Sequence, residues 1–327
     1  MDSPMCNWQH VSDSAAFLLR AQAAPSRGDW MAIVIESSFS EQRPFEVQTP
    51  VEQMVPFVFN SPHSGRHYPG DFLKTSRLDA HTIRVSEDYF VDELFGSAPF
   101  YGAPLLVAHF PRAFLDVNRE PYELDPTMFE GSLPHYLTTN SVRVAGGLGT
   151  IPRLVAENLE IYHTPMRIED ALDRIESFYR PYHDCLRNLI VSTHAAFGAC
   201  VLVDCHSMPA HAQSGSRNRP DFVIGDRFGT SASDAVSQSA ISLLKDLGYT
   251  VARNKPYAGG FITEHYGRPR RGLHALQIEI NRGLYVDEQT FEKNAGFERL
   301  QADLARFVDR LTGDFCQEPD AVALAAE

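Results

Sequence analysis

The chain has 327 residues, 43% of them hydrophobic and 11% aromatic, which is enough apolar material for a substantial globular core. Its formal net charge of -13 argues against a nucleic-acid-binding surface, although a local arginine cluster could still attract a small anion. Five cysteines without a CxxC pair argue against a disulfide-stapled secreted domain, and no stretch is apolar enough to span a bilayer. We therefore expect a cytoplasmic protein with a small-molecule partner, and neither a nucleic-acid nor a membrane partner.

The two ends of the chain differ in pattern from the long middle section. Residues 1–40 carry few periodic apolar positions, and we expect them to form a loosely ordered N-terminal extension. Residues 314–327 are acidic and rich in Ala, which predicts a mobile tail. Residues 41–313 show no internal repeat and no Pro-rich linker, so the sequence predicts a single α/β domain between the two ends.

Five short apolar runs predict the strands of a sheet. They cover residues 55–59, 104–108, 199–203, 221–224 and 275–280. Helical patterns alternate with these runs along the chain. That alternation is typical of a three-layer αβα domain, so the expected fold class is α/β with a mixed, largely parallel sheet between helices.

Three longer segments have the apolar spacing of helices. Residues 168–194 repeat apolar side chains at steps of three and four, and this stripe should face the sheet. Residues 231–248 begin with Ser231 and Asp234, which resemble a capping pair, and end at Gly248. A third helix is predicted for residues 287–311.

Two histidines follow predicted strands at equivalent places. His63 comes shortly after the first run and His206 shortly after the third, each on an expected loop at the carboxyl end of a strand. Open α/β sheets bind their ligands at that edge. A lone loop histidine is usually a surface or hydrogen-bonding residue, but two in equivalent positions can converge on one point. The pattern therefore favours a shared metal ion.

A catalytic zinc site commonly adds one acidic ligand to two histidines and leaves a fourth position for water. Four acidic residues in the segment 86–94 are candidates: Glu87, Asp88, Asp92 and Glu93. Asp92 and Glu93 also fit a helix start, where carboxylates complement the dipole. Glu87 and Asp88 precede that helix, and the spacing leaves the choice between them open.

An arginine-rich segment follows the second predicted strand. Arg112, Asn118 and Arg119 lie just beyond it, and the planar arginine fork suits a carboxylate or a polarised carbonyl. Such residues can hold an amino-acid substrate. The alternative is a structural salt-bridge network with Asp116 and Glu120, which the segment taken alone favours.

Two later features also contribute polar groups. The segment 259–267 contains Gly260, Thr263 and His265 and predicts a flexible loop that presents them to a ligand, or else a plain turn. Glu279 interrupts the apolar run 275–280, and an acidic side chain is costly to bury without a partner. A metal-bound water that needs a base would explain Glu279.

A cysteine hydrolase that uses Cys205 beside His206 is a weaker hypothesis. Adjacent residues on an extended strand point in opposite directions, which is poor geometry for a nucleophile and its base. We therefore favour metal chemistry.

Seven ordered segments resemble the N-formylglutamate amidohydrolase (deformylase) family over roughly residues 55–288. They are SPHSGRHYP, EDYFVDELF, FPRAFLDVNREP, DCHSMP, RPDFVIGD, GGFITEHYG and HALQIEINRGLYVDE. The family is in turn similar to zinc carboxypeptidases and related deacylases, whose fold is a mixed sheet between helices. The resemblance implies an α/β hydrolase of the zinc carboxypeptidase or phosphorylase/hydrolase-like type.

The resemblance implies one Zn²⁺ per chain. His63 and His206 match the two metal-binding histidines of the family. The acidic ligand falls in the segment that contains Glu87 and Asp88, and Asp88 is the better match.

The same resemblance implies catalytic and substrate-binding roles. Glu279 matches the general base, Arg112 the oxyanion-stabilising arginine, and Asn118 with Arg119 the residues that hold a substrate carboxylate. The implied reaction is hydrolysis of N-formyl-L-glutamate to formate and the free amino acid, a step of histidine degradation. Glu264 departs from the family pattern, which often has a basic residue there.

Two alternative functions remain at this point. One is an N-acyl amino acid deacylase with a different acyl specificity, and the other is a non-catalytic metal-binding or ligand-binding relative. The joint presence of both histidines, an acidic candidate and Glu279 argues against the second, because a binding protein has no need of a base.

Overall fold

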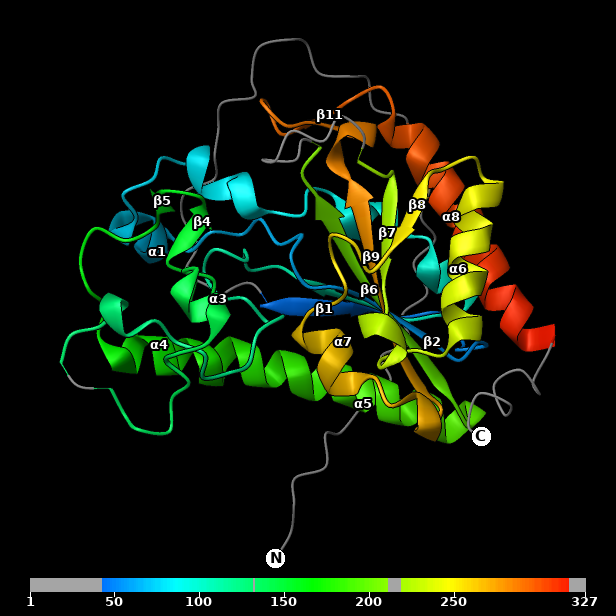
Figure 1. The fold of residues 1–327 in the computed structure, drawn as a ribbon, viewed down its shortest axis with the longest axis horizontal. Coiled ribbons are helices and arrows are strands. Elements are labelled where there is room, and N and C mark those ends of the chain that lie inside the picture. The colour runs from blue at the N-terminus through cyan, green and yellow to red at the C-terminus, as the bar shows by residue number, and fades with distance from the viewer. Residues whose placement is uncertain (1–42, 132, 211–218, 318–327) are drawn as a thin grey trace, which may run out of the picture. The chain divides into compact units, whose positions relative to one another are not determined.

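A mixed seven-stranded β-sheet forms the centre of the fold (Figure 1). The computed structural model describes residues 43–131, 133–210 and 219–317, so the predicted N-terminal extension lies outside the described residues. The strand order across the sheet is β1, β3, β2, β6, β9, β7, β8. The strands are β1 (Phe45–Gln48), β2 (Phe57–Ser61), β3 (Leu105–Ala108), β6 (Cys200–Met208), β7 (Phe222–Gly225), β8 (Val251–Arg253) and β9 (Leu273–Asn281).

Strands β3, β2, β6 and β9 are neighbours and run parallel, while β1 and β7 pair antiparallel with β3 and β9. Strand β8 runs parallel to β7 at the other edge. Two small antiparallel hairpins lie outside the sheet: β4 (Leu154–Ala156) with β5 (Leu159–Glu160), and β10 (Val286–Asp287) with β11 (Glu292–Lys293). The predicted α/β class with a mixed, largely parallel sheet is confirmed.

Helices cover both faces of the sheet. They are α1 (Gly70–Thr75), α2 (Val91–Leu94), α3 (Val142–Ala145), α4 (Ile168–Arg174), α5 (Arg180–Phe197), α6 (Asp234–Asp246), α7 (Phe261–Tyr266) and α8 (Phe297–Gln317). Helices α2, α6 and α8 pack on one face, where α6 and α8 lie side by side, and α5 and α7 pack on the other (Figure 1). No helix among the described residues is long and apolar enough to cross a membrane.

The alternation of side chains along each strand divides the core into two apolar clusters. In β6, Val201, Val203 and Cys205 belong to the cluster under α6 and α8, whereas Cys200 and Leu202 belong to the cluster over α5. Successive side chains of a strand point to opposite faces, so every second residue shares a face. Residues 204 and 206 therefore continue the α5 face of β6.

The strands depart from the sequence prediction mainly at their ends. The predicted strand 199–203 continues to Met208, so His206 lies within β6 and not on a loop after it. Strand β6 is central and hydrogen-bonds to β9 as far as Met208, which satisfies the backbone of these polar residues. Strands β1 and β8 were not predicted.

The helix predicted for residues 168–194 is present as α4, a π-helical turn at Ile175–Tyr179 and α5. Pro181 near the start of α5 has no backbone N–H to donate, which explains the local change in hydrogen bonding. The cap of α6 is Ser233, whose hydroxyl accepts from the Val236 N–H, and not the predicted Ser231. Ser231 instead donates to the Ala275 carbonyl.

The third predicted helix is wrong at its start. The segment from Asp287 first forms the β10–β11 hairpin, and α8 begins only at Phe297. The Asp287 carboxylate accepts the backbone N–H groups of Gln289 and Thr290, and this local turn competes with a helix. Helix α8 then extends to Gln317, beyond the predicted start of the tail.

Candidate metal centre and active site

The candidate site lies at the carboxyl ends of the adjacent parallel strands β2, β6 and β9. His63 follows β2, His206 is in β6, and Glu279 is in β9 directly opposite His206 in the strand register. The strand alternation places both His206 and Glu279 on the α5 face of the sheet. Parallel pairing thus brings together residues far apart in sequence at one edge of the sheet.

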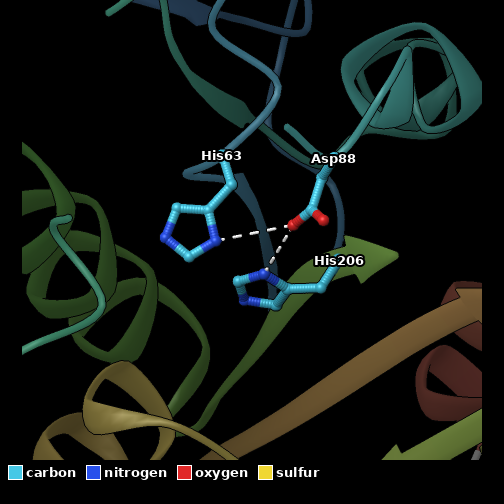
Figure 2. A group of neighbouring side chains, drawn as sticks. All are labelled: His63, Asp88 and His206. Atoms are coloured by element: carbon cyan, nitrogen blue, oxygen red, sulfur yellow. Dashed lines mark hydrogen bonds and ion pairs between the residues drawn. The ribbon is translucent and has the colours of Figure 1, made fainter. Parts of the chain in front are cut away.

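Three side chains from separate elements form a candidate metal group: His63, Asp88 and His206. All three are buried, and one possible ligand atom from each lies within 4.8 Å of the others. Asp88 lies on the loop before α2, and Figure 2 shows both imidazole rings turned toward its carboxylate. The structure therefore brings together the residues that the sequence predicted as metal ligands.

Each imidazole is oriented by a second carboxylate. His63 donates from Nε2 to Asp116 Oδ1 at 2.8 Å, and His206 donates from Nε2 to Asp204 Oδ2 at 2.8 Å. Their Nδ1 atoms face the same atom, Asp88 Oδ2, at 3.5 Å from His63 and 3.0 Å from His206. Carboxylates commonly fix metal-binding histidines in this way.

The donor set fits a zinc ion. His63 Nδ1 is buried and has no hydrogen-bond partner in the structure, so its lone pair is available in the direction of Asp88 and His206. Two imidazole nitrogens and one carboxylate oxygen are a common catalytic zinc donor set with a position left for water.

Local contacts distinguish Asp88 from its neighbour Glu87. Ser207 donates to Asp88 Oδ1 at 2.9 Å and Arg282 lies 3.3 Å from the same oxygen, which leaves Oδ2 directed at the histidines. Tyr68 and Arg84 instead hold the Glu87 carboxylate at 2.7 Å and 3.0 Å. The geometry favours Asp88 as the acidic ligand.

Electrostatics reinforce this arrangement. Burial raises the pKa of Asp88, but the contacts with His206 and His63 lower it well below the usual range. Burial lowers the pKa of His206, yet Asp204 and Asp88 raise it well above its usual value. Asp88 and Asp204 thus make the surroundings of His206 favourable to positive charge.

Glu279 is buried beside this group and lines the same cavity. Burial raises its pKa to about 7, and nearby His206 opposes that shift. Gln277 donates to Glu279 Oε1 at 2.7 Å, and its own Oε1 accepts the Gly260 N–H at 2.7 Å. This chain of hydrogen bonds fixes the orientation of the carboxylate.

Arg112 and Arg119 also line the cavity, and both contact Asp116. Arg112 Nε donates to Asp116 Oδ2 at 3.1 Å, while Arg119 Nη2 lies 3.6 Å from the same oxygen. Burial raises the pKa of Asp116, but Arg119, Arg112 and His63 lower it well below its usual range. Arg112 and Arg119 thus form the predicted salt bridges with Asp116, and they also line the cavity where an anion would bind.

Asn118 is largely committed to protein contacts. Its Oδ1 accepts the Ile262 N–H at 2.8 Å, and its Nδ2 donates to Asp204 at 3.4 Å. A Cβ on Gly260 would lie 2.5 Å from the Asn118 amide, so a glycine is required there. Both residues line the cavity, and together they fix the start of α7 beside the site.

Thr263 and His265 do not line the cavity among the described residues, contrary to the predicted substrate contacts. The expected flexible loop is helix α7, because Thr263 folds back to donate to the Gly260 carbonyl. His265 stacks against Phe261. Their sequence segment lies at the site, but their side chains do not.

Cys205 points away from the site. It belongs to the apolar cluster under α6 and α8, on the opposite face of β6 from His206. Burial raises the pKa of its thiol well above the usual value. This geometry argues against a cysteine nucleophile.

Several groups that support the site were not singled out from the sequence: Asp204, Ser207, Gln277 and Arg282. Asp204 precedes His206 by two residues and Gln277 precedes Glu279 by two. The signal that could have found them is the two-residue period of a strand, had the strands been extended through their polar ends. Nothing in the local sequence indicates that Arg282 contacts Asp88.

The cavity that contains these groups has a volume of about 950 Å³. Its wall includes the metal group, Glu279, the two arginines and the tip of the β4–β5 hairpin. An α/β sheet with a buried His–Asp–His group and a carboxylate at the edge of one cavity fits the class of hydrolases that activate water with a metal ion.

Comparison with known proteins identifies the family. Residues 55–286 match the family model described as N-formylglutamate amidohydrolase, so the chain belongs to that family. A crystal structure of N-formylglutamate amidohydrolase from Ralstonia eutropha JMP134 is 36% identical, covers 84% of this chain and 99% of that one, and superposes with a TM-score of 0.79.

Two curated relatives are more distant in sequence. N-formylglutamate deformylase from Pseudomonas aeruginosa is 28% identical over 245 residues, which is 72% of this chain and 84% of that protein. The Pseudomonas putida deformylase is 25% identical over 238 residues, with 72% and 83% of the two chains covered. The family that the sequence motifs suggested is confirmed.

Proposed function

We propose that the protein is a zinc-dependent N-formylglutamate deformylase that hydrolyses N-formyl-L-glutamate to formate and L-glutamate. The observation that carries this proposal is the convergence of His63, Asp88 and His206 beside Glu279 in a chain of this family. His63 and His206 would bind one zinc ion through Nδ1, and Asp88 through Oδ2. The bound ion would lower the pKa of a water molecule toward about 7.

Glu279 acts as the general base in this mechanism. Its carboxylate takes a proton from the attacking water as the water adds to the formyl carbon, and then passes that proton to the departing amine. The hydrogen bond from Gln277 holds Glu279 Oε1, so the other oxygen is the better candidate for proton transfer. A buried carboxyl with a pKa near 7 can serve both as base and as acid at neutral pH.

The two arginines bind and stabilise negative charge. Arg112 donates to the formyl oxygen as charge develops there, a kind of contact worth on the order of 3 kcal/mol. Arg119 binds the α-carboxylate, using the N–H groups that its contacts with the Leu148 and Asn118 carbonyls leave free. Because a formyl group has few atoms that the protein can contact, the contact with the α-carboxylate positions the formyl carbon for attack.

Metal removal and replacement test the function. Chelator-treated protein should release no formate from N-formyl-L-glutamate, and one equivalent of Zn²⁺ per chain should restore the release. Formate can be followed with a coupled dehydrogenase assay, and bound zinc by elemental analysis. Full activity in metal-free protein would contradict the metal role, and zinc binding without formate release would favour the non-catalytic alternative.

The cavity size supports one alternative substrate class. A volume of about 950 Å³ lies at the upper end for small-ligand sites and leaves room for an acyl group larger than formyl. N-acetyl-L-glutamate and N-succinyl-L-glutamate are the matched test substrates. Faster hydrolysis of either one than of N-formyl-L-glutamate would replace the proposed acyl specificity.

A further inference from the structure

Among the described residues, four arginines line the cavity, and they differ in how fully they are paired: Arg112, Arg119, Arg143 and Arg282. Arg282 is held by Ser207 and Asp88, and Arg112 donates to Asp116. Within the part of the chain that the structure describes, Arg143 makes only a loose ion pair with Glu123, whose Oε2 lies 3.6 Å from its Nη1 and has no hydrogen-bond partner there. Its N–H groups are therefore the least committed of the four.

The backbone ties Arg143 to Arg119. Arg119 Nε donates to the Leu148 carbonyl at 2.8 Å, and the Leu148 N–H donates to the Arg143 carbonyl at 2.8 Å. Ser141 caps helix α3 by accepting the Val144 N–H at 3.0 Å, which fixes the short helix that carries Arg143. These bonds hold Arg143 next to Arg119.

Arg112, Arg119 and Arg143 form a row of neighbouring arginines in the cavity wall, linked through Asp116 and the Leu148 backbone. Arg119 is linked to both of the others: its Nη2 lies 3.6 Å from Asp116 Oδ2, which also accepts from Arg112 Nε, and its Nε donates to the Leu148 carbonyl beside Arg143. Burial lowers the pKa of Arg119, Asp116 raises it, and the nearby charges of Arg112 and Arg143 lower it further. Arg112 is the one near Asp88 and Glu279. The side chain of Arg143 is 32% exposed, against 11% for Arg119, so Arg143 is the more accessible of these two neighbours.

We propose that Arg143 binds the side-chain carboxylate of the substrate and so selects N-formyl amino acids with an acidic side chain. This inference rests on the proposed function. An N-formylglutamate molecule has its formyl oxygen, α-carboxylate and side-chain carboxylate in that order along its length. The row of Arg112, Arg119 and Arg143 offers one guanidinium group to each.

Asp116 and Glu123 pair with the row and offset two of its three positive charges, which leaves one in excess. Glu288 accepts the Ala210 N–H at 3.0 Å, and Glu264 pairs with Arg227 at 2.9 Å outside the cavity wall. Glu264 therefore does not face the substrate side chain, although its position departs from the family pattern. Glu157 at the tip of the β4–β5 hairpin also lines the cavity and would instead favour a cationic side chain.

A pair of isosteric substrates tests the inference. N-formyl-L-glutamate and N-formyl-L-glutamine differ in side-chain charge, and kcat/KM for formate release should be measured for each with the zinc-loaded wild type and Arg143→Gln. The wild type should prefer the glutamate compound by about 10- to 100-fold. Arg143→Gln should lose that preference through a fall for the glutamate compound alone, mainly in KM.

Two matched variants control the experiment. Arg153→Gln removes an arginine that pairs with Asp125 at 2.8 Å and Glu160 at 3.2 Å but does not line the cavity, and it should keep the wild-type preference. Arg143→Lys keeps a positive charge without the planar fork and should recover part of the preference. It also keeps the test valid if Arg143→Gln folds poorly.

The outcomes separate this inference from the proposed function. An equal fall for both substrates in Arg143→Gln, or no fall for either, overturns the role of Arg143 while formate release still supports the deformylase. A wild-type preference for N-formyl-L-lysine overturns the role as well and points to Glu157. Absence of formate release from every substrate by the zinc-loaded wild type contradicts the proposed function itself.

Discussion

Two buried histidines in neighbouring parts of the molecule have opposite electrostatics. His183 on α5 contacts the Val117 carbonyl through Nε2 at 2.8 Å and the Tyr266 hydroxyl through Nδ1 at 2.9 Å, and burial lowers its pKa to about 4. His206 on β6 is equally buried, yet Asp204 and Asp88 raise its pKa well above the usual value. Burial alone thus does not mark a functional histidine, whereas the carboxylates around it do.

Glu279 lies next to His206, but its pKa, like that of His183, is shifted mainly by burial. Burial disfavours the charged form in both, and it raises the pKa of Glu279 to about 7. The surroundings therefore favour the charged forms of Asp88 and His206, whereas Glu279, with a pKa of about 7, changes its protonation near neutral pH.

The largest expected effect is on turnover. Glu279→Gln should lower kcat by about 10²- to 10⁴-fold while the zinc content stays at one per chain, because the amide cannot take the proton from water. Steady-state kinetics and elemental analysis of the same sample measure both quantities. Glu87→Gln is the matched control, since that carboxylate faces Tyr68 and Arg84, and it should keep zinc and most turnover. Substantial activity in Glu279→Gln would reject the assigned base.

The next effect is on acid stability and concerns His183. Its folded-state pKa of about 4 lies below the usual histidine value of 6.5, so its contribution to stability is present above about pH 6.5 and is lost as the pH falls toward 4. The loss amounts to about 3 kcal/mol. His183→Gln should not show this loss. In urea unfolding of the metal-free proteins, the free energy of unfolding of the variant relative to the wild type should therefore rise by about 3 kcal/mol between pH 7 and pH 4. Parallel pH curves for the two proteins would disprove this.

A smaller effect is expected on metal affinity. Asp204→Asn should weaken zinc binding by about 10- to 100-fold, because Asp204 orients His206 through the 2.8 Å hydrogen bond to Nε2. Competition with a chelator measures the affinity. His183→Gln provides the comparison and should bind zinc as the wild type does, since His183 touches no candidate ligand. Unchanged affinity in Asp204→Asn would mean that Asp204 does not position the imidazole.

The sequence predicted the fold class and the family correctly because apolar runs and local motifs carry that information. It failed where polar residues continue a strand: Asp204 and His206 look like a loop but belong to β6, since the neighbouring strand β9 satisfies their backbone groups. It also failed for Asp287, whose side chain starts a turn where a helix was expected. The roles of the site residues remain predictions.

The sequence alone determined the types of candidate ligand. It also placed His63 after the strand that is β2 and His206 at the end of the strand that is β6. Only the tertiary structure shows that Asp88 faces the two histidines, whereas the Glu87 carboxylate is held by Tyr68. It also brought Arg143 into the cavity wall. Such contacts join residues distant in the chain, and no local pattern encodes them.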